Sequence, residues 1–224
     1  MLRRRNMMGS KCGIPPIINL SLTDAIDNVI INKGTGGAIY NATITDYSTT
    51  ENHVSNASGL TLNKRAYAKV VYGFNASKSF TLCVRGRINE LSSVTYQMIC
   101  WTEQDTLSVY RASGGAFDIK ITDSTTGLSL DSSKATLTAS KRVLNIDTSH
   151  ISYLADHTYV FIGNTETGII NLYIDGELMA HQTMSTLPTS TSILLGDNTG
   201  KYYANQINIS DVRVWDCAVD IDSI

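Results

Sequence analysis

The chain has 224 residues, of which 42% are hydrophobic and 17% charged, and its formal net charge is −2 at pH 7. This balance excludes a disordered chain, and it provides no overall field that would attract nucleic acid or an anionic membrane. No stretch approaches 18 consecutive apolar residues, so no membrane-spanning helix is predicted.

The first fourteen residues form a basic leader that we expect to be flexible. Three arginines follow Met1-Leu2, as in a signal peptide, but Gly9, Ser10 and Lys11 come where such a peptide needs an apolar stretch. We therefore expect cytoplasmic synthesis and reduced cysteines. The spacing of the four cysteines does not suit zinc, and the sequence leaves open any disulfide among Cys12, Cys83, Cys100 and Cys217.

Short runs rich in Val, Ile, Thr, Tyr and Phe, broken by Gly, Asn, Asp and Ser, predict strands and turns. In chain order the predicted strands are 17–22, 60–62, 66–72, 79–88, 95–101, 107–111, 116–122, 157–163, 168–174, 177–183, 192–196 and 206–215. Residues 32–59 are predicted to be a long connection with a short β segment at Ala38 to Tyr40. Residues 123–150 alternate only weakly, and 149–155 suit one helical turn.

Two of these segments carry the clearest signals. Phe80, Leu82 and Val84 alternate with polar or small residues, which predicts one face on the core and places Arg85 and Arg87 on the other. Asp175-Gly176 separates two apolar runs and is the strongest hairpin signal in the chain.

Many short strands at this spacing favour an all-β, antiparallel two-sheet sandwich with little or no helix. No composition shift or Pro-rich linker divides the chain. The sequence therefore predicts a single β-sandwich domain over residues 15–220.

Four segments resemble, in order and spacing, the strands of a known superfamily. They are Ser79-Phe-Thr-Leu-Cys-Val-Arg-Gly86, Gly168-Ile-Ile-Asn-Leu-Tyr-Ile-Asp-Gly-Glu-Leu178, Ile193-Leu-Leu-Gly-Asp197 and Ile207-Asn-Ile-Ser-Asp-Val-Arg-Val-Trp215. Together they resemble concanavalin A-like and laminin G-like jelly rolls of the lectin/glucanase kind, across about residues 17–216. The resemblance implies a jelly-roll fold, which hosts sugar binders, hydrolases, adhesion modules and structural parts alike.

The hydrolase alternative needs a carboxylate pair that the sequence does not provide. Retaining glucanases of this superfamily carry Glu-x-Asp-x-Glu, or the same motif with one more residue before the last Glu, on one strand. Glu103-Gln-Asp105 begins this pattern, but Thr106, Leu107 and Ser108 follow. We therefore predict no catalytic residue and no enzymatic activity, and we interpret Glu103 and Asp105 as turn residues.

The resemblance to laminin G domains also implies a Ca²⁺ site at the rim, built from carboxylate and amide oxygens. The candidate donors are Asp24, Asp27, Asp197, Asn198 and Asp211. No compact Asp-x-Asp run is present, so the same residues also suit ordinary turns.

Sugar binding needs an aromatic platform beside short polar groups. Tyr202 and Tyr203, in a loop of small and polar residues, and Trp101, at a strand end, are the candidate platforms. Arg85 and Arg87 could pair with anionic sugars, although solvent exposure alone also accounts for them. The core is the alternative place for Trp101.

Three functional hypotheses follow from these observations, and the third is a glycoside hydrolase whose catalytic carboxylates lie elsewhere in the chain. The first is a non-catalytic binding or adhesion module that recognises a glycan or a protein surface. The second is a structural component of a phage virion, in the tail or associated with the capsid, where virion proteins would be the partners. The basic leader and the expected reduced cysteines favour the second, and the fold accommodates all three.

Overall fold

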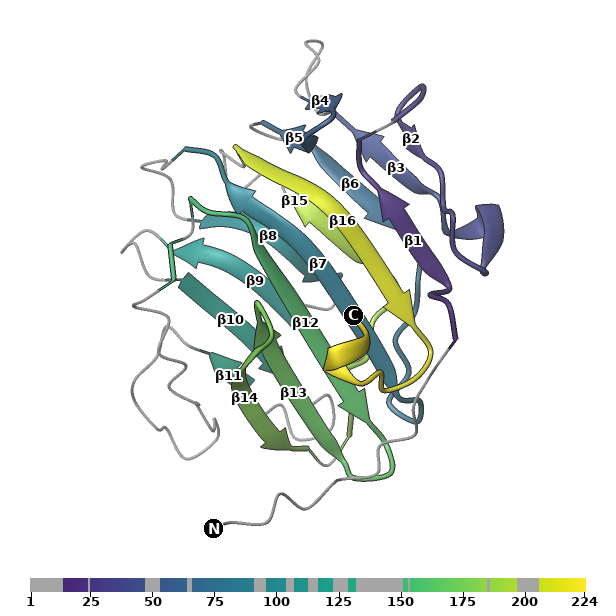
Figure 1. Ribbon diagram of the computed structural model, residues 1–224, viewed down its shortest axis with the longest axis vertical. Helices are drawn as coiled ribbons and strands as arrows, with labels where there is room; N and C mark the ends of the chain where they lie inside the picture. Colours follow the sequence, from purple (N-terminus) through teal and green to yellow (C-terminus); the bar gives the residue numbers. More distant parts are fainter. Residues whose placement is uncertain are drawn as a thin grey trace.

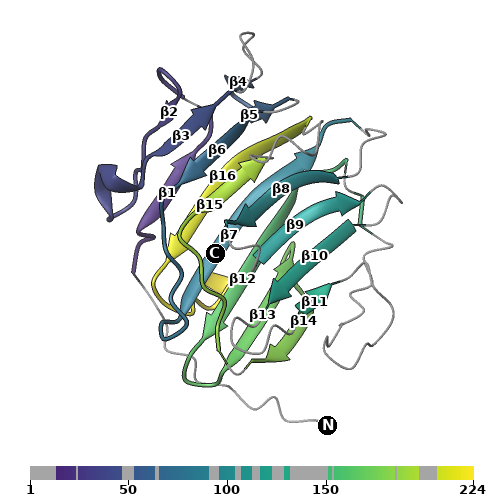
Figure 2. The same cartoon turned by 180° about the vertical axis from the view of Figure 1, so that it is seen from behind.

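Two antiparallel β-sheets lie face to face in the computed structural model, with sheet A in front in Figure 1 and sheet B in front in Figure 2. The predicted all-β, two-sheet jelly roll is confirmed, and the helices of the described residues are two short 3₁₀ turns, η1 (Gly37–Tyr40) and η2 (Ile221–Ser223). The structure describes residues 14–23, 25–46, 53–63, 66–90, 96–103, 107–112, 117–122, 129–131, 151–152, 154–184, 186–196 and 206–224.

Sheet A has the strand order β14–β13–β12–β7–β16–β5–β4, and β1 also pairs with β16. Its central strands β7 and β16 are nine residues long. The eight strands are β1 (Ile18–Ser21), β4 (His53–Asn56), β5 (Gly59–Leu62), β7 (Phe80–Ile88), β12 (His157–Asn164), β13 (Ile169–Ile174), β14 (Glu177–Thr183) and β16 (Ile207–Trp215).

Sheet B has the order β11–β10–β9–β8–β15–β6–β3–β2. Consecutive strands such as β5, β6, β7 and β8 alternate between the two sheets, so the chain crosses repeatedly from one layer to the other. The eight strands are β2 (Val29–Ile30), β3 (Ala42–Thr45), β6 (Tyr67–Val70), β8 (Tyr96–Thr102), β9 (Leu107–Ala112), β10 (Phe117–Thr122), β11 (Ser129–Asp131) and β15 (Ile193–Gly196).

The core fills the space between the sheets, as strand alternation requires. Phe80, Leu82 and Val84 of β7 are at most 2% exposed and belong to one apolar cluster that includes residues of both sheets. The prediction for this strand is therefore confirmed. Arg85 lies on the opposite face and is exposed, as the same alternation predicts.

A second apolar cluster lies on the outer face of sheet A. Cys83, Val160, Ile162 and Trp215 project from this face and pack against Val219 in the segment that follows β16. Figure 1 shows this C-terminal segment lying across the front of sheet A. The hydroxyl of Thr81 holds the C-terminal segment in place, because its Oγ1 donates to the Cys217 carbonyl (2.8 Å) and accepts from the Val219 amide (3.0 Å).

The hairpin predicted at Asp175-Gly176 is confirmed and connects β13 to β14. Both turn residues have positive φ angles, 50° at Asp175 and 83° at Gly176. A two-residue turn of this kind requires positive φ at both positions, and Asp-Gly is among the pairs that tolerate it best.

The prediction of a long connection over residues 32–59 is wrong in part. Ala42–Thr45 forms β3, which pairs with β6, and His53–Asn56 forms β4, which pairs with β5. Both strands are only four residues long, and in β4 the side chain of His53 is buried while that of Val54 is exposed, which is the reverse of the usual pattern. Ala38 to Tyr40 lies in a 3₁₀ turn and not in a strand.

The cysteines divide into two kinds. Cys83 and Cys100 are buried free thiols, and burial raises the pKa of Cys83 to about 11 and that of Cys100 to about 12. Cys217 is disulfide-bonded, so the expectation of reduced cysteines is wrong for this residue. Sequence spacing could not reveal it, because a disulfide depends on which sulfur atoms the fold brings together.

Among the described residues, no helix has the length and apolar character needed to cross a membrane.

Truncation of the core tests the packing between the sheets. We expect Leu82→Ala to lower the free energy of unfolding by about 3 kcal/mol, because the fully buried side chain leaves a cavity. Val54→Ala is the control: this side chain is 52% exposed, and we expect a change below about 0.5 kcal/mol. Urea unfolding measures both. Equal losses would contradict the assigned core.

Candidate functional site

A pocket of about 580 Å³ opens on the outer face of sheet A, beside the C-terminal segment. We call it the outer-face pocket. Its walls come from β7, β12, the β13–β14 turn, β16 and η2, which are distant in sequence. The lining residues are Arg85, Thr158, Val160, Asp175, Gly176, Ser210, Asp211, Arg213, Ile221 and Ile224.

A bulge in β16 shapes this pocket. The pairing of β16 with β7 shifts between Ile209 and Asp211, so Ile209 faces the core before the shift and Val212 faces it afterwards. The extra residue is Ser210, and it lines the pocket together with Asp211. A bulge re-aims neighbouring side chains in this way, because two residues on one strand lie opposite a single partner residue.

Arg85 supplies an available positive charge. It lies opposite Thr158 on one side and Asp211 on the other. Within the part of the chain that the structure describes, its guanidinium makes no hydrogen bond or ion pair. Arginine offers five N–H donors in a planar fork, so this side chain can bind an anion without first breaking an internal contact.

Arg213, in contrast, is fully engaged. Its Nε donates to Asp211 Oδ2 (2.7 Å), and Nη1 donates to the main-chain oxygen of Ile224 (3.3 Å). Its Cζ lies 5.7 Å from the centre of a Trp215 ring, within the range of a cation–π contact. Arg213 therefore holds the C-terminal segment against sheet A and neutralises Asp211.

The opposite wall is held by Asp175. Its Oδ1 accepts from the amide of Thr158 (2.8 Å), and its Oδ2 lies 2.6 Å from His157 Nδ1. His157 Nε2 lies 2.8 Å from the carbonyl oxygen of Ser152. Both carboxylates of the pocket thus have partners within the protein, which leaves Arg85 as the pocket charge without one among the described residues.

The other predicted binding residues lie elsewhere. Arg87 is on the same face as Arg85 but does not line the pocket, and its Nη1 lies 3.6 Å from Asp156 Oδ2. Trp101 belongs to sheet B, where its Nε1 donates to the Gly196 carbonyl (2.9 Å). Tyr202 and Tyr203 lie outside the described residues.

The predicted calcium donors are only partly described. Asp27 lies in the turn before β2, whereas Asp211 lies in β16 and binds Arg213. Asp24, Asp197 and Asn198 lie outside the described residues. Within the residues that the structure describes, no three His, Cys, Asp or Glu residues are grouped as a metal site would require.

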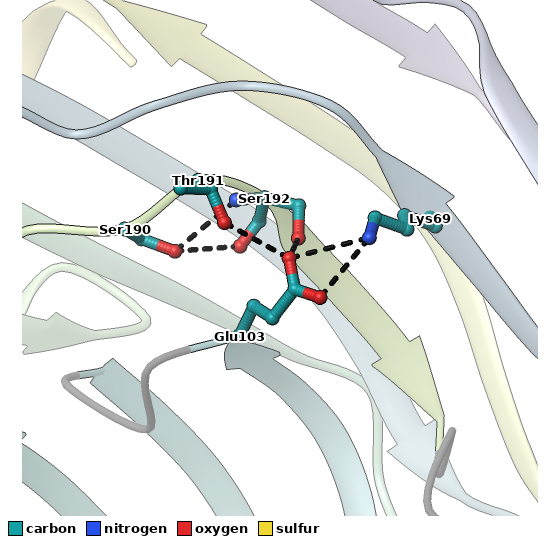
Figure 3. A network of polar contacts seen from close by, with 5 residues as sticks. All are labelled: Lys69, Glu103, Ser190, Thr191 and Ser192. Atoms are coloured by element: carbon teal, nitrogen blue, oxygen red, sulfur yellow. Dashed lines mark hydrogen bonds and ion pairs between the residues drawn. The ribbon is translucent and has the colours of Figure 1, made fainter.

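Glu103, the residue that begins the incomplete glucanase pattern, is the centre of a polar network (Figure 3). Its carboxylate accepts from the hydroxyls of Ser192 (2.5 Å) and Thr191 (2.9 Å) and from Lys69 Nζ (3.2 Å). These three partners, in that order of importance, hold the pKa of Glu103 below its ordinary value. The network joins the end of β8 to β6 and to the start of β15.

This network gives Glu103 a structural role. A general acid of a glycosidase needs a raised pKa so that it carries a proton at the working pH. Glu103 has the opposite shift, and its oxygens are already occupied. Asp105 lies outside the described residues.

Sequence reasoning found Arg85 from alternation on β7, but it missed most of the pocket. Asp175 and Arg213 were predicted only as parts of a hairpin and a strand, Thr158 only as a strand residue, and Asp211 was assigned to calcium. The signal that could have revealed the pocket is the Asp-Val-Arg run after Ser210. The apolar–polar alternation of the strand shifts there, and both charged residues fall on the face opposite the buried Val212.

Comparisons with known proteins agree with this architecture. Residues 55–224 match the family model of the concanavalin A-like lectin/glucanases superfamily. No curated protein matches the sequence.

Solved structures show the same fold at low identity. The binding domain of botulinum neurotoxin serotype D is 14% identical, with a TM-score of 0.61 over 93% of this chain and 50% of that chain. Botulinum neurotoxin type C, whose cell entry depends on interaction with two ganglioside molecules, is 15% identical, with a TM-score of 0.59 over 93% and 49%. Trypanosoma rangeli sialidase bound to sialic acid is 14% identical, with a TM-score of 0.60 over 92% and 31%.

The chain thus spans about half the length of these toxin chains and less than a third of the sialidase chain. Identities this low establish the fold and leave the ligand to be argued from the residues of this protein.

The Glu103 network predicts a pH-dependent loss of stability. We expect Glu103→Gln to lower the free energy of unfolding by about 1 kcal/mol at pH 7, a small effect because the side chain is 38% exposed and its charge is screened. A lowered pKa stabilises the fold above the ordinary value of 4.5, and this contribution is lost as the pH falls through the lowered value.

The difference between the variant and the wild type should therefore shrink below pH 4.5 and disappear in more acidic solution. Urea unfolding across this pH range measures it. Glu166→Gln, in the exposed turn between β12 and β13, is the matched control and should track the wild type. A Glu103→Gln deficit that persists at acidic pH would contradict the assigned network.

Proposed function

Because the chain belongs to the concanavalin A-like lectin/glucanases superfamily, we propose that it is a non-catalytic module that binds a glycan in the outer-face pocket. The observation that carries the proposal is the guanidinium of Arg85 on the pocket wall, which has no partner among the described residues. An arginine held in this way suits a carboxylate or sulfate group, which it can bind through two parallel hydrogen bonds. The proposed ligand is therefore an acidic glycan.

The remaining lining supports a sugar ligand. The hydroxyls of Thr158 and Ser210 suit sugar hydroxyls, while Val160, Ile221 and Ile224 provide apolar surface. The volume of about 580 Å³ lies within the range of about 300–1,000 Å³ that is usual for small-molecule sites. The pocket is thus large enough for the acidic residue of a glycan and part of its neighbour.

The state of the carboxylates favours binding over hydrolysis. A glycosidase needs one carboxyl group that gives up a proton and another that attacks or activates water. Asp211 is bound by Arg213, and Asp175 is bound by the Thr158 amide and lies beside His157. These contacts position the two acids as wall elements that balance charge around the ligand.

The proposal is tested by binding of the full chain to a glycan array that contains carboxylated, sulfated and neutral members, followed by titration calorimetry with a carboxylated hit. We expect Arg85→Ala to weaken binding at least about tenfold, because a bidentate charged contact contributes about 1.5–3 kcal/mol. Arg85→Lys keeps the charge but loses the planar fork, so we expect an intermediate loss.

Arg87→Ala provides the charge-matched comparison. It removes the same charge from the same strand and face, but its guanidinium lies outside the pocket lining, near Asp156. We expect a loss below about threefold, from the change in overall field alone. Absence of any acidic ligand for the wild type, or equal losses in both variants, would overturn the proposal.

A further inference from the structure

A second, smaller pocket of about 190 Å³ lies among η1, the β6–β7 connection and the residue that follows β16. We call it the end pocket. Its lining includes Tyr40, Tyr72, Phe74, Asn75, Lys78 and Asp216. None of them lines the outer-face pocket, and none was a candidate binding residue in the sequence.

Aromatic rings form one wall of the end pocket. Tyr40 and Tyr72 meet edge to face with centroids 5.6 Å apart, and Phe74 meets Tyr72 at 5.2 Å. Tyr72 and Phe74 are buried, whereas Tyr40 is half-buried and presents part of its ring. Gly36 leaves room for this ring, because a Cβ atom there would lie 2.4 Å from Tyr40.

The polar wall offers an acceptor, a neutral donor and a cation. Asp216 Oδ1 accepts a hydrogen bond from the Tyr72 hydroxyl, while Oδ2 has no partner among the described residues. Asn75 Oδ1 accepts from the Ser77 amide (2.9 Å), which leaves its NH₂ group without a partner in the same part of the chain. Lys78 likewise makes no side-chain hydrogen bond or ion pair there.

Burial, followed by the hydrogen bond to Asp216, raises the pKa of Tyr72 well above its ordinary value. The Tyr72 hydroxyl therefore remains a donor and holds Asp216 in one orientation. The free oxygen of Asp216 is thus fixed relative to the aromatic wall. Binding of a ligand group to it therefore costs little free energy for ordering the side chain.

We propose that the end pocket is a second carbohydrate site that takes one uncharged hexose unit. Its apolar ring face would lie against Tyr40, and neighbouring hydroxyls would donate to Asp216 and accept from Asn75 and Lys78. A hydroxyl both donates and accepts, so an acceptor beside two donors suits a pair of adjacent hydroxyls. The volume lies below the range of drug-sized sites, which limits the ligand to about one ring.

The charges set this site apart from the outer-face pocket. Arg85 in the outer-face pocket has no partner among the described residues, whereas the end pocket offers both the Lys78 cation and the free Asp216 oxygen, so an anion there would meet a carboxylate. The end pocket is also independent of Arg85, and the inference does not depend on the proposed acidic ligand.

The test uses saturation-transfer NMR and calorimetry on the full chain with methyl glycosides of glucose, galactose, mannose and N-acetylglucosamine. We expect at least one of them to bind, and Tyr40→Ala and Asp216→Asn each to weaken it at least tenfold. Ile39→Ala is the matched control, because this neighbour in η1 is 75% exposed and does not line the pocket. It should bind as the wild type does.

Tyr72→Phe keeps the buried ring but releases Asp216, so it should lose affinity while the variant still unfolds cooperatively at a temperature well above that of the binding assay. This variant separates loss of the site from loss of the fold. An acidic glycan added in excess should leave the neutral glycoside bound, which separates this site from the outer-face pocket. No binding by any of the four glycosides, or binding unchanged in Tyr40→Ala and Asp216→Asn, would overturn the inference.

Discussion

The antiparallel pairing of β7 with β16 is the constraint on which the rest of the structure depends. Leu82 lies opposite Val214 on the inner face, and Arg85 lies opposite Asp211 on the outer face. A slip of one residue would exchange these faces and place charge in the core. The bulge after Ile209 keeps apolar side chains inside along both halves of β16, and it delivers Ser210 and Asp211 to the pocket.

The outer face of sheet A is covered as well as the inner one. The segment after β16 packs on Cys83 and Val160, and Trp215 Nε1 donates to the carbonyl of Ile14 (3.1 Å), which ties the first described residues to the same region. An antiparallel sheet often leaves one face to water. Here the cover is partial, and the outer-face pocket opens between η2 and the strands beside it.

Trp215 and Asp216 are neighbours in the sequence, but each lies beside a different proposed site. Trp215 supports Arg213 beside the outer-face pocket, while Asp216 lines the end pocket. Among the described residues, the first pocket has an available cation and no aromatic lining, and the second has an aromatic wall with both a cation and a carboxylate. The outer-face pocket would therefore recognise a glycan by charge pairing, and the end pocket would do so by ring stacking. Occupation of both by one ligand would multiply their affinities, provided that the ligand spans them.

By itself the sequence determined most of the strands, their inward faces and the Asp175-Gly176 turn, because each is set by neighbours within a few residues, although β3 and β4 were not predicted. It also placed Arg85 on the outer face of its strand. It could not show that Arg87 lies beside Asp156 while Arg85 has no partner in the described part of the chain, since the Arg87 contact joins residues about 70 positions apart. Only the tertiary structure decided which polar side chains meet, because closing the two sheets and folding the last segment across one of them brings distant segments into a shared pocket.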